Sequence, residues 1–214
     1  MVPAGPEDLD VAEKLGGPVM SAALLDRPKV QPMTPGPAPV IGTARLSLRP
    51  HRLSDADAMA ETLSDFAVTR MLSRVPAPYH RQDALDWLVP VTSGALPGWN
   101  LAITNGDDAH IGMVSVELRH GRWHLGYWLN RYYWRRGYMS EAVEAVLERF
   151  SRRMPDMPVH SGVFADNPAS LRLQEKLGFR MTGCSEIYSF ARNTMVAHVE
   201  TVLQPGALQA ARAA

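Results

Sequence analysis

The sequence predicts a single α/β domain, and three observations support this prediction. The chain has 214 residues, of which 46% are hydrophobic, enough for one well-buried core with some length left over. Between residues 99 and 130, apolar and polar residues alternate in three segments that are typical of antiparallel strands. Between residues 142 and 150, apolar residues recur along one stripe of a helix.

The strands are expected where short alternating segments lie between turn residues. Asn105–Asp108 and His120–Gly121 are such turns, and they join the three central strands into a meander. The predicted strands span residues 45–50, 99–104, 110–119, 123–129, 159–164, 180–188 and 194–203.

The helices are expected from apolar stripes and from residues that begin or end helices. Pro90 is expected to end the second helix because proline has no backbone N–H to donate. Asn167, followed by Pro168, is expected to cap the fourth helix. The predicted helices span residues 58–66, 81–88, 140–153 and 167–177.

The two ends of the chain differ from the middle. Eight prolines fall within residues 1–40, which are therefore expected to form a flexible tail or a strap lying on the domain. The folded domain is predicted to span residues 41–204, and residues 205–214 are expected to be a C-terminal tail.

Composition excludes several classes of protein. Lys+Arg and Asp+Glu both number 22, so no global charge attracts nucleic acid or an acidic membrane. The single cysteine, Cys184, favours a reducing, cytoplasmic setting, and we expect it to be buried and inert. We see neither an apolar run of membrane-spanning length nor a secretory signal. The seven histidines lack ligand spacing, so we predict no metal.

The stretch from 123 to 150 organises the chain. A strand leads through the basic turn Arg135–Met139 directly into a helix, and free N–H groups at a helix start favour bound anions. We interpret this turn as a site for a pyrophosphate, with a solvated basic corner as the alternative. A nucleotide P-loop is excluded because no G-x-x-x-x-G-K-[ST] string is present.

Two segments carry a family resemblance. Residues 126–142, with Gly137 in the turn, resemble the acetyl-CoA signature of GNAT N-acetyltransferases, and residues 167–179 resemble that family's second signature. Residues 45–50 and Pro78–Tyr79 are similar to the RimJ/RimL branch, which acetylates protein N-termini. Three positions depart from the family pattern: Trp134, Met139, and Gln174 in place of a tyrosine that protonates the leaving thiolate.

The resemblance covers about residues 43–203 and implies a GNAT fold. That fold is a mixed, mostly antiparallel sheet, splayed in the middle, with helices on both faces. It implies an enzyme that moves an acetyl group from acetyl-CoA to a primary amine by direct attack. The RimJ/RimL likeness favours a protein N-terminal α-amine. A small amine, amino acid or antibiotic is the alternative acceptor, a non-catalytic acetyl-CoA-binding module is the alternative of another class, and a homodimer is left open.

The resemblance also assigns roles to residues. Backbone and side chains of the strand, the turn and the second signature are expected to hold the cosubstrate. These cofactor-binding residues are Tyr127, Trp128, Leu129, Arg135, Arg136, Gly137, Tyr138, Met139, Ser140, Asn167 and Ser170.

Acetyl transfer also needs groups that move protons, because an ammonium has no lone pair for attack. His124 is the first candidate base, with a strand histidine of no catalytic role as the alternative. Glu117 is the second candidate, acting through water. Ser170 is the candidate acid for the leaving thiolate, or else only a residue of the helix cap. The N–H of Leu129 is the expected donor to the thioester oxygen.

Overall fold

The computed structural model describes residues 34–213, so the expectation for residues 1–33 lies outside the described residues. Eight strands form one sheet in the order β1-β2-β3-β4-β5-β6-β8-β7. Every neighbouring pair is antiparallel except β5 and β6, which are parallel. The strands are β1 (Ile41–Gly42), β2 (Ser47–Pro50), β3 (Gly98–Thr104), β4 (His110–Arg119), β5 (Arg122–Leu129), β6 (Val159–Phe164), β7 (Arg180–Ser189) and β8 (Thr194–Leu203).

Helices pack against this sheet, and most of them lie where the sequence predicted helices. Short 3₁₀ turns occur at Leu53–Asp55 and Arg131–Tyr133. The α-helices are α1 (Ala56–Ser64), α2 (Phe66–Thr69), α3 (Arg81–Thr92), α4 (Tyr138–Arg153), α5 (Pro168–Lys176) and α6 (Ala207–Ala213).

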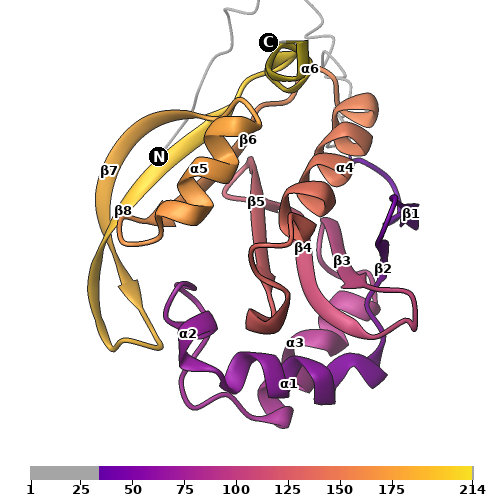
Figure 1. The fold of residues 1–214 in the computed structure, drawn as a ribbon, viewed down its shortest axis with the longest axis vertical. Coiled ribbons are helices and arrows are strands. Elements are labelled where there is room, and N and C mark those ends of the chain that lie inside the picture. The colour runs from indigo at the N-terminus through magenta and orange to yellow at the C-terminus, as the bar shows by residue number, and fades with distance from the viewer. Residues whose placement is uncertain (1–33, 214) are drawn as a thin grey trace, which may run out of the picture. The chain divides into compact units, whose positions relative to one another are not determined.

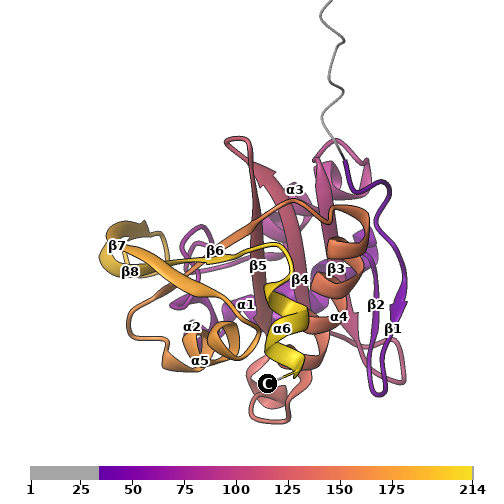
Figure 2. The same ribbon diagram turned by 90° about the horizontal axis from the view of Figure 1, so that it is seen from above.

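The alternation of side chains along β5 divides the protein into two cores. Trp123 and Leu125 point to the larger core, where they pack with Val143 and Phe150 of α4. Trp128 points the other way, into a smaller core made with α1 and α3. Figure 2 accordingly shows α4 and α6 in front of the sheet and α1 and α3 behind it. Helices therefore cover both faces, as the sequence predicted.

The sheet splays between β5 and β6. These strands pair only at their first residues, Trp123 with Val159 and His124 with His160. After this point β6 continues along β8, while β5 continues along β4. Figure 1 shows the two strands diverging towards the N-terminal ends of α4 and α5. The expected splay is confirmed, and it leaves one edge of β5 without a strand partner from Leu125 onward.

Three expectations from the sequence were wrong. Pro90 lies inside α3, which continues to Thr92. Losing one N–H near the last turn of a helix removes a single hydrogen bond, so the helix tolerates the proline there. Residues 205–214 are not a simple tail, because α6 places Leu208 in the larger core at 2% exposure. Cys184 is exposed on β7 rather than buried.

The segment before β1 lies on the domain from residue 35 onward. The indole N–H of Trp99 donates to the carbonyl oxygen of Gly36 at 2.9 Å, and Arg153 donates to that of Pro35 at 3.2 Å. Ala38 packs against the larger core. These contacts fit the strap interpretation for the last part of the proline-rich arm. Among the helices within residues 34–213, none has the length and apolar character needed to cross a membrane.

Candidate active site

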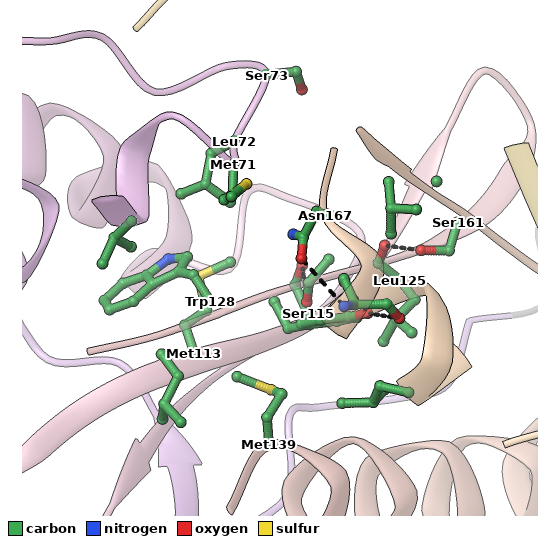
Figure 3. Close-up of a pocket in the computed structure, with 18 of the residues that line it drawn as sticks. Met71, Leu72, Ser73, Met113, Ser115, Leu125, Trp128, Met139, Ser161 and Asn167 are labelled. Atoms are coloured by element: carbon green, nitrogen blue, oxygen red, sulfur yellow. Dashed lines mark hydrogen bonds between the residues drawn. The ribbon is translucent and has the colours of Figure 1, made fainter. Parts of the chain in front are cut away.

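A cleft of about 1610 Å³ begins where β5 and β6 separate. It extends from the turn before α4 to the segment between α2 and α3. In the close-up of Figure 3, Met139 of α4 and Met71 lie on opposite sides of the cavity, with Ser115 and Asn167 between them. The cleft therefore extends from the N-terminal end of α4 to the segment that follows α2.

The turn before α4 presents backbone N–H groups to one end of the cleft. Arg135 and Gly137 both adopt positive φ, at 61° and 78°, and Gly137 is the N-cap of α4. Consecutive N–H groups in such a turn, followed by a helix N-terminus, form an anion-binding concavity. The residues present therefore fit a pyrophosphate, as the sequence predicted.

Arg45, which the sequence did not assign to the site, holds this turn in place. Its Nε and backbone N donate to the carboxylate of Glu141 at 2.8 and 3.0 Å, and its Nη1 donates to the carbonyl oxygen of Arg136 at 2.9 Å. Its guanidinium lies 4.5 Å from the ring centroid of Tyr138. Arg45 thus adds positive charge beside Gly137. Arg45 lies in the bend between β1 and β2, far in sequence from the turn, so the sequence gives no signal for this role.

The free edge of β5 offers backbone donors to the cleft. The N–H of Asn130 donates to Ile111 on the β4 side at 2.8 Å. Because N–H groups alternate along a strand, those of Leu129 and Tyr127 point the other way, towards the gap left by β6. The carbonyl oxygen of Leu129 accepts a hydrogen bond from the Trp134 indole at 2.7 Å, which fixes this end of the strand. Leu129 is therefore placed to donate where the sequence expected an oxyanion donor.

Ser170 and Tyr127 meet at the middle of the cleft. The two hydroxyl oxygens lie 2.6 Å apart. The amide nitrogen of Gln174 donates to the Tyr127 oxygen at 3.1 Å. A phenol that accepts from Gln174 can direct its own proton at Ser170, and this leaves the Ser170 hydroxyl proton free to point into the cleft. Burial raises the pKa of Tyr127, although both of these hydrogen bonds oppose that effect.

Gln174 is buried at the centre of this network and is held in one orientation by its hydrogen bonds. It is 1% exposed, and its nitrogen also donates to Ser161 Oγ at 2.9 Å. Its carbonyl oxygen accepts from Thr201 Oγ1 at 2.6 Å, so the orientation of the amide is determined. The glutamine that replaces the family's tyrosine therefore holds a different tyrosine, Tyr127, against Ser170. The sequence predicted Tyr127 only as a cofactor contact.

Asn167 connects the same region to the start of α5. Its side-chain oxygen accepts from the backbone N of Ser170 at 3.2 Å, which confirms it as the N-cap. Ser170 therefore sits in the first turn of a helix, where the dipole favours a nearby negative charge such as a thiolate.

The two candidate bases lie side by side on the face of the sheet that lines the far end of the cleft from α4, which we call the acceptor face. Glu117 of β4 is paired with His124 of β5, and His124 is paired with His160 of β6. Burial, together with Arg119, His160 and Arg122, lowers the pKa of His124 to about 4. His124 is therefore neutral at pH 7 and keeps a free lone pair.

Glu117 is constrained by arginines. Its Oε2 accepts from Arg119 Nε at 2.8 Å and Nη2 at 2.5 Å, and Arg74 Nη2 lies 3.5 Å away. Its other oxygen, Oε1, has no hydrogen-bond partner among residues 34–213. One carboxylate oxygen thus remains available for water or an amine.

The structure brings nearly all of the predicted site residues to one cleft. His124, Glu117, Ser170 and the predicted cofactor contacts line it, with the single exception of Arg136. The Arg136 guanidinium instead lies 5.7 Å from the ring centroid of Tyr133. The cleft also includes residues that the sequence did not assign to the site, among them Ser115, Tyr133, Trp134, His160, Ser161 and Thr201.

Comparison with known proteins agrees with this geometry. The family model for the acetyltransferase (GNAT) domain matches residues 45–180. The chain belongs to the GNAT acetyltransferase family. It is 26% identical over 160 residues to the uncharacterized N-acetyltransferase p20 of Bacillus licheniformis, an alignment covering 72% of this chain and 89% of p20. The family assignment confirms an acyltransferase, with acetyl-CoA as the expected cosubstrate.

Solved structures share the fold. RimJ of Mycobacterium smegmatis in complex with CoA-disulfide has a TM-score of 0.69 at 18% identity, covering 85% of this chain and 96% of that one. RimL, a ribosomal L7/L12 α-N-protein acetyltransferase in complex with coenzyme A, has a TM-score of 0.68 at 16% identity, covering 79% and 99%. These similarities support the RimJ/RimL-like branch of the fold.

One cluster of possible metal ligands lies away from the cleft. His51, Asp55 and His110 place one ligand atom each within 4.8 Å of the others. The Asp55 oxygens already accept from Arg49 Nη1 at 3.0 Å and Nη2 at 2.8 Å, and from the backbone N of Arg52 at 2.8 Å. The Arg49 guanidinium disfavours a second cation there. We interpret the cluster as a buried polar contact, and the sequence prediction of no metal stays a prediction.

Proposed function

We propose that this acetyltransferase transfers the acetyl group of acetyl-CoA to the α-amine of a protein N-terminus. The observation that carries the proposal is the acceptor end of the cleft, which is lined from His124 to the segment 71–76 and belongs to a cavity of about 1610 Å³. The similarity to RimJ and RimL structures supports this acceptor class.

We assign the proton-transfer roles from the contacts in the cleft. His124 takes a proton from the acceptor ammonium, directly or through water, because it is neutral and lies on the acceptor face. Glu117 acts as the second acceptor of protons through its free Oε1. The freed amine then attacks the thioester carbonyl carbon, while the N–H of Leu129 donates to the oxygen that becomes negative.

Ser170 acts on the leaving group. When the carbon–sulfur bond breaks, its electron pair stays on sulfur, and the Ser170 hydroxyl donates a hydrogen bond to this thiolate. Tyr127 and Gln174 hold the hydroxyl in that orientation. The turn Arg135–Ser140 and the free edge of β5 hold the pyrophosphate and the pantetheine arm.

A panel of acceptors tests the proposal. Initial rates with acetyl-CoA are measured for a peptide with a free N-terminus and no lysine, for the same peptide with a blocked N-terminus and one lysine, and for small amines. We expect the highest kcat/KM for the free N-terminus. A higher kcat/KM for a small amine or for the lysine peptide would overturn the acceptor class.

The same panel tests the binding-module alternative. A module would bind acetyl-CoA in calorimetry and transfer acetyl to none of the acceptors. The network at Ser170 and the neutral His124 favour the enzyme, because a module has no need of a hydroxyl directed into the cleft.

A further inference from the structure

Three arginines gather at the acceptor end of the cleft. Arg119 of β4 stands directly opposite Arg122 of β5 in the sheet register, and Arg74 reaches the same place from the segment between α2 and α3. Like charges directly opposite on neighbouring strands destabilise a sheet. Arg119 is paired with Glu117, whereas Arg122 is exposed, so its charge is available to a bound anion.

One carboxylate faces these three cations at close range. Glu117 accepts from Arg119 and lies 3.5 Å from Arg74, while Arg122 forms no hydrogen bond or ion pair with any residue between 34 and 213. The local balance is three positive charges against one negative charge. Burial and repulsion by Arg119 lower the pKa of Arg74, which agrees with an excess of positive charge.

The other carboxylates that line the cleft are engaged elsewhere. Asp166 accepts from Arg70 and Arg192, and Glu200 accepts from Ser185. Asp83 accepts from the backbone N of His80 at the start of α3, and Asp86 accepts from Gln82. Among residues 34–213, none of these four carboxylates forms an ion pair with Arg74, Arg119 or Arg122.

The arginine row has a definite place relative to the candidate base. Arg119 and Arg122 form the residue pair next to Glu117 and His124 on the same face of the sheet. Residues two apart on a strand are separated by roughly 7 Å. An acceptor whose amine lies at His124 can therefore place a carboxyl carbon two to six bonds from its amine near Arg122, while the guanidinium of Arg119 reaches back to Glu117 and Gly126.

We propose that the acceptor carries a carboxylate close to its reactive amine, most simply an N-terminal segment with an acidic side chain at its second residue. The proposal rests on the proposed acetylation of N-terminal amines and specifies which N-termini bind. The carboxylate pairs with Arg122, and Arg119 and Arg74, which both contact Glu117, add positive charge nearby. It also offsets the repulsion that Arg119 and Arg122 exert on protonated His124, which makes His124 a stronger base when this acceptor is bound.

The test compares acceptors that differ only in charge. Peptides that begin alanyl-aspartyl, alanyl-asparaginyl and alanyl-lysyl are assayed with acetyl-CoA; they are otherwise identical, and the lysine side chain is trimethylated, so that it keeps its charge and the α-amine is the one amine that can be acetylated. Phenylalanine and phenylalanine amide form a second pair. We expect the aspartyl peptide to exceed the asparaginyl peptide about tenfold or more in kcat/KM, with the lysyl peptide slowest, and we expect added salt to reduce the ratio.

Single-residue variants test whether Arg122 causes the preference for the aspartyl peptide. Arg122→Gln is expected to reduce the aspartyl-to-asparaginyl ratio to below about threefold, because Arg122 has no hydrogen-bond or ion-pair partner among residues 34–213 and is available to the acceptor. A ratio taken within one variant cancels any loss of folded protein or of acetyl-CoA binding. Arg81→Gln removes an exposed arginine on α3 that pairs with Asp57 outside the cleft, and it should leave the ratio unchanged.

The outcomes separate this inference from the proposed function. Equal rates for the aspartyl and asparaginyl peptides, or a preference for the lysyl peptide, overturn the inference and leave N-terminal acetylation standing. If only the small amines react, N-terminal acetylation fails, and faster transfer to phenylalanine than to its amide still supports the arginine site. No transfer to any acceptor overturns both.

Discussion

The phenolic oxygen of Tyr127 lies 2.6 Å from the hydroxyl oxygen of Ser170, although 43 residues separate the two in sequence. Either hydroxyl can donate across this distance; because Gln174 already donates to the phenol, we take Tyr127 as the donor and Ser170 as the acceptor. The Ser170 proton is then free for the sulfur of the leaving group.

Tyr127→Phe is expected to lower kcat about 10-fold or more, because Ser170 loses the partner that orients it. A matched Tyr132→Phe change, at an exposed tyrosine outside the cleft, should have no effect. Ser170→Ala should lower kcat similarly, and the double variant should be no slower than Ser170→Ala alone.

Binding of free CoA gives a second measurement that does not depend on turnover. The ultraviolet absorbance of the thiolate, followed against pH, reports the pKa of the bound CoA thiol. We expect that pKa to rise in Tyr127→Phe and in Ser170→Ala, because the thiolate loses a hydrogen bond. A bound thiol with the same pKa in all three proteins would contradict the role of the pair.

His124→Gln is expected to lower kcat/KM at pH 7.5 by about 100-fold, with unchanged affinity for CoA. Because the pKa of His124 is lowered to about 4, the wild-type protein holds it neutral throughout pH 5–9. The pH profile of kcat/KM in that range should therefore show only the titration of the acceptor amine. A break near pH 6.5 that disappears in His124→Gln would show an unshifted histidine, and an unchanged rate would exclude His124 as the base.

Gly137→Ala tests the turn before α4. Alanine at φ 78° costs roughly 1–2 kcal/mol, and its Cβ would make only an ordinary contact of 3.4 Å with Arg45 Nη2, so the backbone strain is what should shift the turn. We expect weaker CoA binding in calorimetry. Gly94→Ala is the control, because Gly94 has φ 72° with open space around it and lies outside the cleft. Equal loss of CoA affinity in both variants would exclude a specific role for the turn.

Acid should destabilise the protein well before its carboxylates are protonated. Burial lowers the pKa of His110 to about 4, whereas the unfolded chain keeps it near 6.5. Between these values the unfolded state binds the additional proton, so the free energy of unfolding falls as pH drops through this window, by on the order of 2–3 kcal/mol. Urea denaturation at pH 7.5, 6 and 5 measures this loss.

A matched pair of histidine variants checks the assignment. His110→Gln should reduce the dependence on pH between 6.5 and 4 without abolishing it, because His124, whose pKa is also lowered to about 4, still contributes. His120→Asn, at an exposed turn, should leave it as in the wild type. If both variants keep the full dependence, another group is responsible.

Local sequence patterns predicted most of the fold because the elements are marked by short-range signals. The central strands and α4 carry clear apolar periodicity, and Asn167 with Pro168 marks the start of α5. The prediction that Pro90 ends its helix was wrong because a single proline cannot outweigh the packing of Leu88 and Ala84, which are buried on the same helix. The C-terminal helix was missed because its apolar contact, Leu208, is one residue in an alanine-rich segment.

The site could be predicted only where its residues are neighbours in sequence. The turn at Gly137 and the cap at Asn167 belong to continuous motifs. The pairing of Tyr127 with Ser170 and Gln174, and the row formed by Arg119 and Arg122, depend on how distant elements meet. No spacing along the chain encodes those contacts, so the structure was needed to find them.

Acetyl transfer to a single peptide that carries both a free α-amine and a lysine tests the central claim most directly. The peptide is incubated with the protein and acetyl-CoA, and fragmentation mass spectrometry locates the acetyl group. The account predicts acetylation at the N-terminal nitrogen, and its loss in His124→Gln. Acetylation of the lysine side chain in preference to the α-amine, or a peptide left unmodified while acetyl-CoA is bound, would contradict it.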